Sequence, residues 1–240
     1  MDNNPIKKRM ARRQHIYRKR IPYGMMNFVS VRERDCYYVD KTPFIEEIEN
    51  SNMYFFYIRP RRFGTSLTLS MLKQYYDINM ADRFEELFGG LYIGENPTPE
   101  HNTYLIISLN FAVVDANLEN YKKGLDAHCN TEFNYFCDVY AQYLPANLKE
   151  EMNKKDGAAE QLDYLCKECK KTGQKVYLFI DEYDHFTNKI LSEPACLEDY
   201  KSETHGTGYL RSFFDTVKAG TDSTIKRCFV TGVSPVTMDD

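Results

Sequence analysis

Four short runs of apolar residues alternate along the chain with longer stretches in which apolar residues recur at helical spacing. The runs are "MYFFYI" from Met53, "YLIISLNF" from Tyr104, "VYLFIDEYD" from Val176 and "KRCFVTGVSP" from Lys226. Short unbroken apolar runs predict strands that are buried on both faces. Strands that alternate with helices across long connections predict an α/β fold, in which helices cover both faces of a mostly parallel sheet.

The expected helices carry recognisable start and stop signals. Thr42 followed by Pro43 predicts a helix over about 43–50, because a threonine hydroxyl can cap free amides and proline is tolerated at the first helical position. The spacing also predicts helices from Ser66 onward, over about 118–143, over 157–172 and over 208–219. Lysines followed by Gly173 end the third of these as a helix C-terminus prefers.

The first apolar run leads into "FFYIRPRRFGTSLTLSML", Phe55 to Leu72. A strand, a basic turn and a helix that starts Gly-x-Ser form an anion site, because the free amides and the dipole of the helix point at the turn. Gly64 allows close backbone approach, and the Ser66 hydroxyl is placed to bind Mg²⁺. Compared with the phosphate-loop pattern G-x-x-x-x-G-K-[ST], the turn has Arg59 at the first glycine and Thr65 at the lysine. Alone, it is compatible with an ordinary strand-to-helix turn.

A second element strengthens the prediction of a nucleotide site. "VYLFIDEYD" places Asp181 and Glu182 at the end of an apolar strand, at the edge of an α/β sheet where ligands bind. Asp181 is suited to hold Mg²⁺ through water, and Glu182 to orient or deprotonate an attacking water. Acids at this position can also simply cap the next helix. The Gly-x-Ser turn and the acidic strand together favour a nucleotide site.

Composition sets the class and suggests partners. Of the 240 residues 42% are hydrophobic and 28% are charged, as in a globular protein, and no apolar stretch is long enough for a membrane span. The net charge is -4, yet residues 1–20 contain eight Lys/Arg and one acid. This basic arm favours a solvated tail and leaves nucleic acid open as a partner. Seven cysteines without framework spacing predict free thiols in a reducing cytoplasm.

Several motifs together resemble a known family. "YYVDKTPFIEEI", "YFFYIRPRRFGTSLTLSMLKQYYD", "LFIDEYD" and "FVTGVSPVT" occur in the order of the AAA-ATPase-like domain of bacterial P-loop proteins, which often continue into a PD-(D/E)xK nuclease-like domain. The resemblance implies a three-layer P-loop NTPase fold over residues 21–240, with residues 1–20 as a separate basic arm. It also implies that this chain ends before the family's usual C-terminal continuation, and it leaves self-association open.

The resemblance assigns roles to individual residues. It implies that ATP and Mg²⁺ are the cofactors, that Ser66 and Asp181 contact the metal, and that Glu182 is the catalytic acid beside Asp181. Thr231 and Ser234 are similar to the polar sensor of the γ-phosphate. The expected nucleotide contacts are Arg61, Arg62, Phe63, Gly64, Thr65, Ser66, Leu67, Thr231 and Ser234.

The family's turn carries a lysine where this chain has Thr65, whereas Arg59 is a family trait. A neutral hydroxyl cannot replace the ammonium that contacts the β- and γ-phosphates, so we expect ATP binding with impaired hydrolysis. Two alternatives stay open: Arg61 or Arg62 replaces the lysine in an active ATPase, or the chain is a nucleotide-free scaffold or nucleic-acid-associated protein. Whether Thr65 is natural or engineered is open as well.

Overall fold

A parallel four-stranded sheet forms the centre of the part of the chain that the computed structural model describes, residues 19–60, 63–114, 121–185 and 208–233. Its strands are β1 (Tyr54–Ile58), β2 (Leu105–Asn110), β3 (Val176–Asp181) and β4 (Ile225–Gly232), in the spatial order β1-β4-β3-β2. The α/β fold with a parallel sheet is therefore confirmed. Because all four strands run parallel, their carboxyl ends lie at one edge of the sheet.

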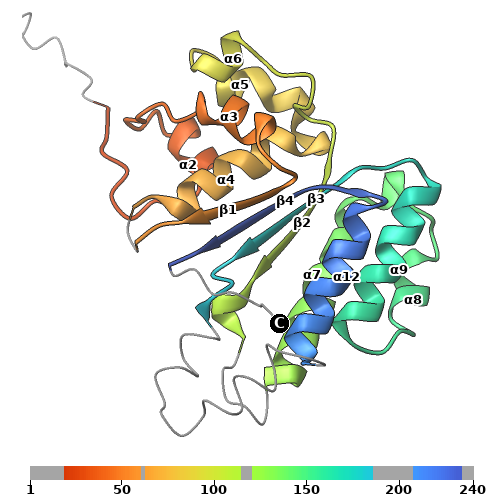
Figure 1. Cartoon of the computed structure of the whole chain (residues 1–240). Coiled ribbons are helices and arrows are strands. Elements are labelled where there is room, and N and C mark those ends of the chain that lie inside the picture. The colour runs from red at the N-terminus through yellow and green to blue at the C-terminus, as the bar shows by residue number, and fades with distance from the viewer. Residues whose placement is uncertain (1–18, 61–62, 115–120, 186–207, 234–240) are drawn as a thin grey trace, which may run out of the picture.

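Helices cover both faces of the sheet (Figure 1). On one face lie α2 (Phe28–Glu33), α3 (Phe44–Asn50), α4 (Thr65–Tyr76), α5 (Phe84–Phe88) and α6 (Tyr92–Glu95). On the other lie α7 (Tyr121–Val139), α8 (Leu148–Met152), α9 (Gly157–Lys171) and α12 (Tyr209–Thr221). Short 3₁₀ segments span Ile78–Arg83, Phe111–Val113 and Ala141–Tyr143. The three-layer arrangement agrees with the prediction.

The two faces of the sheet belong to different cores. On β3, Leu178 and Ile180 pack into the core under α7, α9 and α12, whereas Tyr177 and Phe179 pack into the core under α4. These side chains are at most 1% exposed, because successive strand residues point to opposite faces and both faces are covered. The prediction of a strand that is buried on both faces is confirmed for residues 176–180 of β3.

Two local predictions are wrong. β1 is not buried on both faces, because it is the edge strand of the described sheet and its Phe56 is 56% exposed. Thr42 does not cap the helix predicted over about 43–50, which is α3. Pro43 is the N-cap of α3, while the Thr42 hydroxyl donates to Asp40 and accepts from the amide of Ile93. Both outcomes depend on contacts distant in sequence.

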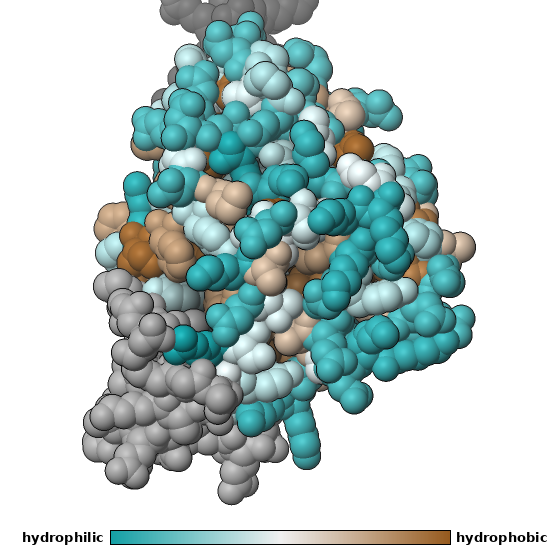
Figure 2. Space-filling model, turned by 45° about the vertical axis from the view of Figure 1, so that its right-hand side comes forward, coloured by the Kyte–Doolittle hydropathy of each residue, from teal (hydrophilic) through white to brown (hydrophobic). Residues whose placement is uncertain are grey.

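The remaining helices follow their apolar spacing, and α9 ends two residues before Gly173, which adopts φ +72°. The six cysteines within the described ranges are buried free thiols, as predicted. In Figure 2 the visible surface is mostly hydrophilic, broken by scattered apolar side chains, as expected for helices with polar outer faces. Among the described helices, none combines the length and apolar character that crossing a bilayer requires.

Candidate functional site

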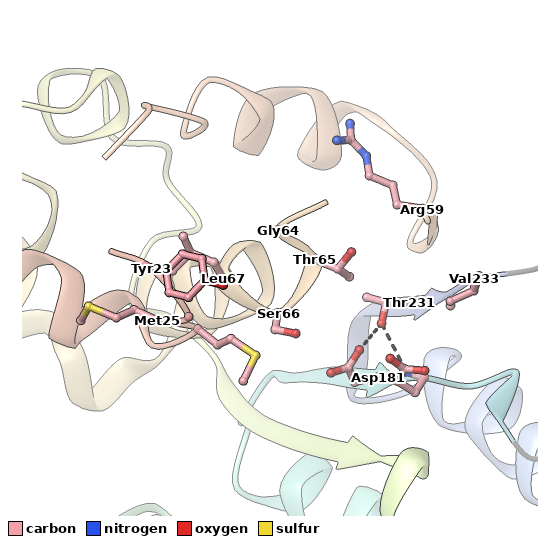
Figure 3. A pocket seen from close by; sticks show the side chains of 14 residues that line it. Tyr23, Met25, Arg59, Gly64, Thr65, Ser66, Leu67, Asp181, Thr231 and Val233 are labelled. Atoms are coloured by element: carbon pink, nitrogen blue, oxygen red, sulfur yellow. Dashed lines mark hydrogen bonds between the residues drawn. The ribbon is translucent and has the colours of Figure 1, made fainter. Parts of the chain in front are cut away.

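A cavity of about 780 Å³ lies at the carboxyl edge of the sheet, where α4 begins (Figure 3). It gathers segments that are far apart in sequence: the residues around Tyr23, the start of α4, the end of β3 and the end of β4. Of the residues predicted for the site, the structure places seven in the lining: Gly64, Thr65, Ser66, Leu67, Asp181, Glu182 and Thr231.

The start of α4 supplies unpaired backbone amides to this cavity. Gly64 is the N-cap and has φ +81°, a left-handed conformation that glycine adopts without strain. No side chain among the described residues caps the helix, and the Thr68 hydroxyl and amide both bond to the Gly64 carbonyl. Because the first amides of a helix have no partner within it, they are available to an anion in the cavity.

Asp181 is fixed at the opposite wall. The Thr231 hydroxyl, which is 1% exposed, donates a hydrogen bond to Asp181 Oδ1 across the neighbouring strands β4 and β3 (Figure 3). The carboxylate is only partly buried and lines the cavity. Thr231 therefore holds one carboxylate oxygen and leaves the carboxylate able to accept further ligands.

Glu182 follows β3 in a strained conformation. Its φ is +55°, a left-handed value that costs a non-glycine residue about 1–2 kcal/mol. The strain is offset by strand contacts, since the Glu182 amide donates to Thr231 Oγ1 at 3.4 Å and the Tyr183 amide donates to the Thr231 carbonyl at 3.0 Å. This turn ends the strand and brings Glu182 into the cavity lining.

The other predicted contacts have different outcomes. Phe63 is 60% exposed and is absent from the cavity lining. Arg61, Arg62 and Ser234 lie outside the described residues, as do the first 18 residues of the basic arm. The structure therefore does not bear on their predicted roles.

Sequence reasoning missed several residues that line the cavity. Tyr23, Met25 and Met26 form a part of the lining that precedes the sheet in sequence, beside the predicted contact Leu67 on α4 (Figure 3). A glycine turn inside the apolar-rich "IPYGMM" was the available signal. Arg59 also lines the cavity, and its guanidinium lies 4.8 Å from the centre of the Tyr57 ring. In the sequence, Arg59 differs from the first glycine of the phosphate-loop pattern, and that pattern does not predict a place for its side chain in the cavity.

A partly buried lysine supports the helix beneath the site. Lys73 on α4 donates to Ser108 Oγ on β2 at 3.1 Å. Burial lowers the pKa of Lys73, while the nearby charge of Asp181 acts in the opposite direction. Lys73 thus ties α4 to the sheet and adds positive charge near Asp181.

The donor set fits Mg²⁺ that arrives with a phosphate ligand. Ser66 and Asp181 offer a hydroxyl and a carboxylate to one cavity, and Mg²⁺ usually takes one or two protein oxygens together with phosphate oxygens and water. Among the described residues, no group of three or more His, Cys, Asp or Glu side chains forms a metal site of its own. The site therefore fits Mg²⁺ as part of a nucleotide complex.

A parallel sheet whose first strand is followed by a helix with Gly64 as its N-cap and with free amides at its start, and with acids at the end of a nearby strand, defines an α/β protein of the P-loop type. The comparisons specify the family: the family described as "Predicted AAA-ATPase" matches residues 22–240, and the chain belongs to it. The chain is also 42% identical over 77 residues to "Uncharacterized protein in vnfD 5'region" from Azotobacter chroococcum mcd 1. That match spans 32% of this chain and only 14% of the relative. No solved structure matches the chain.

Proposed function

We propose that this chain binds ATP with Mg²⁺ at the carboxyl edge of its sheet and hydrolyses it slowly or not at all. The observation that carries the proposal is the meeting of Ser66, at the uncapped start of α4, with Asp181 in one cavity. Family membership supports a nucleotide as the ligand. The amides of α4 would bind the phosphates, and Ser66 and Asp181 would hold Mg²⁺.

The cavity also accommodates the base. The stretch that contains Tyr23, Met25 and Met26, together with Leu67, offers an apolar and sulfur-rich surface beside the polar phosphate region. Aromatic rings stack on other flat rings, and the polarisable thioether sulfur of methionine also packs well against them. A nucleobase is a flat aromatic ring system and would therefore fit this lining. The pocket thus has a polar end for phosphates and an apolar end for adenine.

Each side chain has a distinct role in the proposed chemistry. Glu182 accepts the proton of the attacking water, while Thr231 keeps Asp181 in place. Bound Mg²⁺ would neutralise charge on the phosphate oxygens. Thr65 offers only a neutral hydroxyl at the position where the family's loop carries lysine.

The missing ammonium affects hydrolysis more than binding. One charge-assisted hydrogen bond contributes about 1.5–3 kcal/mol, so its loss should weaken ATP binding roughly tenfold to hundredfold if no other group compensates. A cation that acts on the transition state of phosphoryl transfer accelerates it by about 10³ to 10⁵. The proposal is therefore a binding module with reduced turnover.

Thr65→Lys tests this proposal. We expect the purified Thr65→Lys protein to hydrolyse ATP at least tenfold faster than the wild type and to bind a slowly hydrolysed ATP analogue more tightly. Thr172→Lys, which adds a lysine at the exposed end of α9, is the matched control and should change neither. Wild-type hydrolysis that Thr65→Lys does not increase would contradict the proposal and favour an active enzyme that uses Arg61 or Arg62. If neither the wild type nor Thr65→Lys binds the ATP analogue at millimolar concentration, the interpretation that stands is that of a nucleotide-free scaffold protein.

A further inference from the structure

A tightly bonded turn precedes α3 and contains the motif Asp40-Lys41-Thr42. Asp40 Oδ1 accepts hydrogen bonds from the Thr42 amide at 2.8 Å and from the Thr42 hydroxyl at 2.7 Å. Asp40 Oδ2 accepts from the Tyr92 amide at 2.8 Å, and Thr42 Oγ1 accepts from the Ile93 amide at 3.1 Å. Two of the three polar side chains thus fasten the turn to the start of α6.

The third side chain, Lys41, extends toward the phosphate loop. A Cβ atom built on Gly64 would lie 3.3 Å from Lys41 Nζ, so the ammonium sits beside the residue that caps α4. Lys41 also lines a second cavity of about 280 Å³, which shares Gly64 and Leu67 with the main cavity. The two cavities are therefore neighbours across the start of α4.

No acid in the described part of the chain lies within ion-pair distance of the Lys41 ammonium. Within the described residues, Lys41 has no ion pair and no side-chain hydrogen bond. Asp40, the adjacent acid in sequence, directs both carboxylate oxygens to the amides and hydroxyl that fix the turn. A positive charge is thus held beside Gly64 without a described partner.

We propose that Lys41 binds the phosphates of the nucleotide and replaces part of the charge that Thr65 does not provide. This inference rests on the proposed function, because it assigns a further residue to the same site. An ammonium on a four-carbon stem is a mobile point charge that can reach phosphate oxygens from outside the loop. The turn that carries Lys41 is held in place by Asp40 and Thr42. Less conformational entropy is therefore lost when Lys41 binds a phosphate.

Lys41 reaches the site from the turn before α3 and not from the loop itself. A lysine at position 65 would stand on the first turn of α4, directly beside the phosphates, whereas Lys41 lies on the side of Gly64 where the second cavity opens. We therefore assign it to ground-state binding and not to transition-state stabilisation. This assignment explains how the site can keep affinity while hydrolysis remains low.

The test compares nucleotide affinities of the full chain and five variants by competition with a fluorescent ATP analogue in Mg²⁺. Lys41→Met should weaken ATP binding about tenfold to hundredfold, and Lys41→Arg should restore most of it. Adenosine affinity should change less than twofold, since it has no phosphate. Lys226→Met removes an exposed lysine at the amino end of β4 and should change nothing. In a Thr65→Lys background, the loss from Lys41→Met should shrink to a few-fold.

The outcomes separate this inference from the proposed function. If wild type and Thr65→Lys bind ATP but Lys41→Met binds equally well, the role of Lys41 is refuted and the proposed function stands. If neither wild type nor Thr65→Lys binds ATP, the role of Lys41 and the proposed function are both refuted. Equal losses for ATP and adenosine would indicate a structural role and overturn the inference. A thermal melt checks folding, and Lys41→Gln, which keeps a polar side chain, replaces Lys41→Met if that variant unfolds.

Discussion

The two walls of the cavity are stabilised in different ways. On the acidic wall, Asp181 and Glu182 are tied to the buried Thr231 through a side chain and an amide. On the loop wall, the start of α4 has no side-chain cap among the described residues. The acidic wall is therefore fixed before ligand arrives, whereas the amides of the loop wall remain available to it.

Under the proposed function, this difference determines which steps of ATP binding and hydrolysis the chain would retain. The acidic wall contains the carboxylates that metal binding and water activation require, and strand pairing sets their positions. The loop wall has Gly64 in the left-handed region and carries the neutral side chain of Thr65 at the first position of α4. Binding depends on geometry and charge together, while rapid hydrolysis depends on charge close to the transferred phosphoryl group. A change at one residue of the loop wall can thus separate binding from turnover.

The largest expected effect comes from Glu182 on the acidic wall. In a Thr65→Lys background, Glu182→Gln should lower ATP hydrolysis about 10²- to 10⁴-fold, because the amide cannot accept the proton of the attacking water. The affinity for the ATP analogue should remain within about twofold, because no ground-state contact is removed. Steady-state phosphate release and analogue binding measure the two quantities.

Glu47→Gln provides the control for Glu182→Gln, since Glu47 is an exposed acid on α3 and lies outside the cavity lining. Hydrolysis should be the same with and without this control substitution. Undiminished turnover in Glu182→Gln would show that another group activates water, and the assignment of the acidic wall would then be wrong.

A smaller effect is expected at Asp181. Asp181→Asn keeps an oxygen for the Thr231 hydroxyl but removes the negative charge, so the extra ATP affinity that Mg²⁺ confers should fall about tenfold. Titrations of the analogue with Mg²⁺ and with a chelator give this ratio. Asp215→Asn, at an exposed site on α12, should leave it unchanged. An unchanged ratio in Asp181→Asn would remove Asp181 from the metal site.

The acidic wall was easier to predict from sequence than the loop wall. An apolar run that ends in Asp181 and Glu182 is a local signal, and the fold carries the end of such a run to the ligand edge of the sheet. The run could not reveal that β4 separates β1 from β3, since strand order is a property of the folded chain. The hydrogen bond from Thr231 to Asp181 follows from that order and was not foreseen.

The loop wall depends on contacts between distant segments. The sequence predicts that Thr42 caps a helix, yet the Thr42 hydroxyl forms hydrogen bonds with Asp40 and with the amide of Ile93, which is 51 residues away. Tyr23 joined the cavity because the chain before α2 folds back over the start of α4. Local propensity contains no information on such contacts, so the sequence around Lys41 predicts a helix start and not the position of the Lys41 side chain beside Gly64.

The smallest expected effect tests how the loop wall is held. Burial raises the pKa of Asp40, but hydrogen bonds from Tyr92 and Thr42 outweigh it and leave the pKa below its ordinary value of 3.8. A lowered pKa means that the ionised carboxylate stabilises the fold above that value, and that this stability is lost as the pH falls through the folded-state pKa. Asp40→Asn should therefore lower the free energy of unfolding by about 1 kcal/mol near pH 7, because the amide keeps only one of the two acceptor oxygens that bond to Thr42 and Tyr92.

The pH dependence distinguishes this explanation from a general packing defect. Urea unfolding of wild type and Asp40→Asn should show their largest difference near pH 7, and the difference should shrink as the pH falls below 3.8 and through the lowered pKa of the folded-state carboxylate. ATP affinity at neutral pH should fall only a few-fold, because Lys41 keeps its charge and loses only part of its fixed position. A stability difference that does not change with pH would mean that the Asp40 carboxylate does not hold the turn. The loop wall would then need another source of order for Lys41.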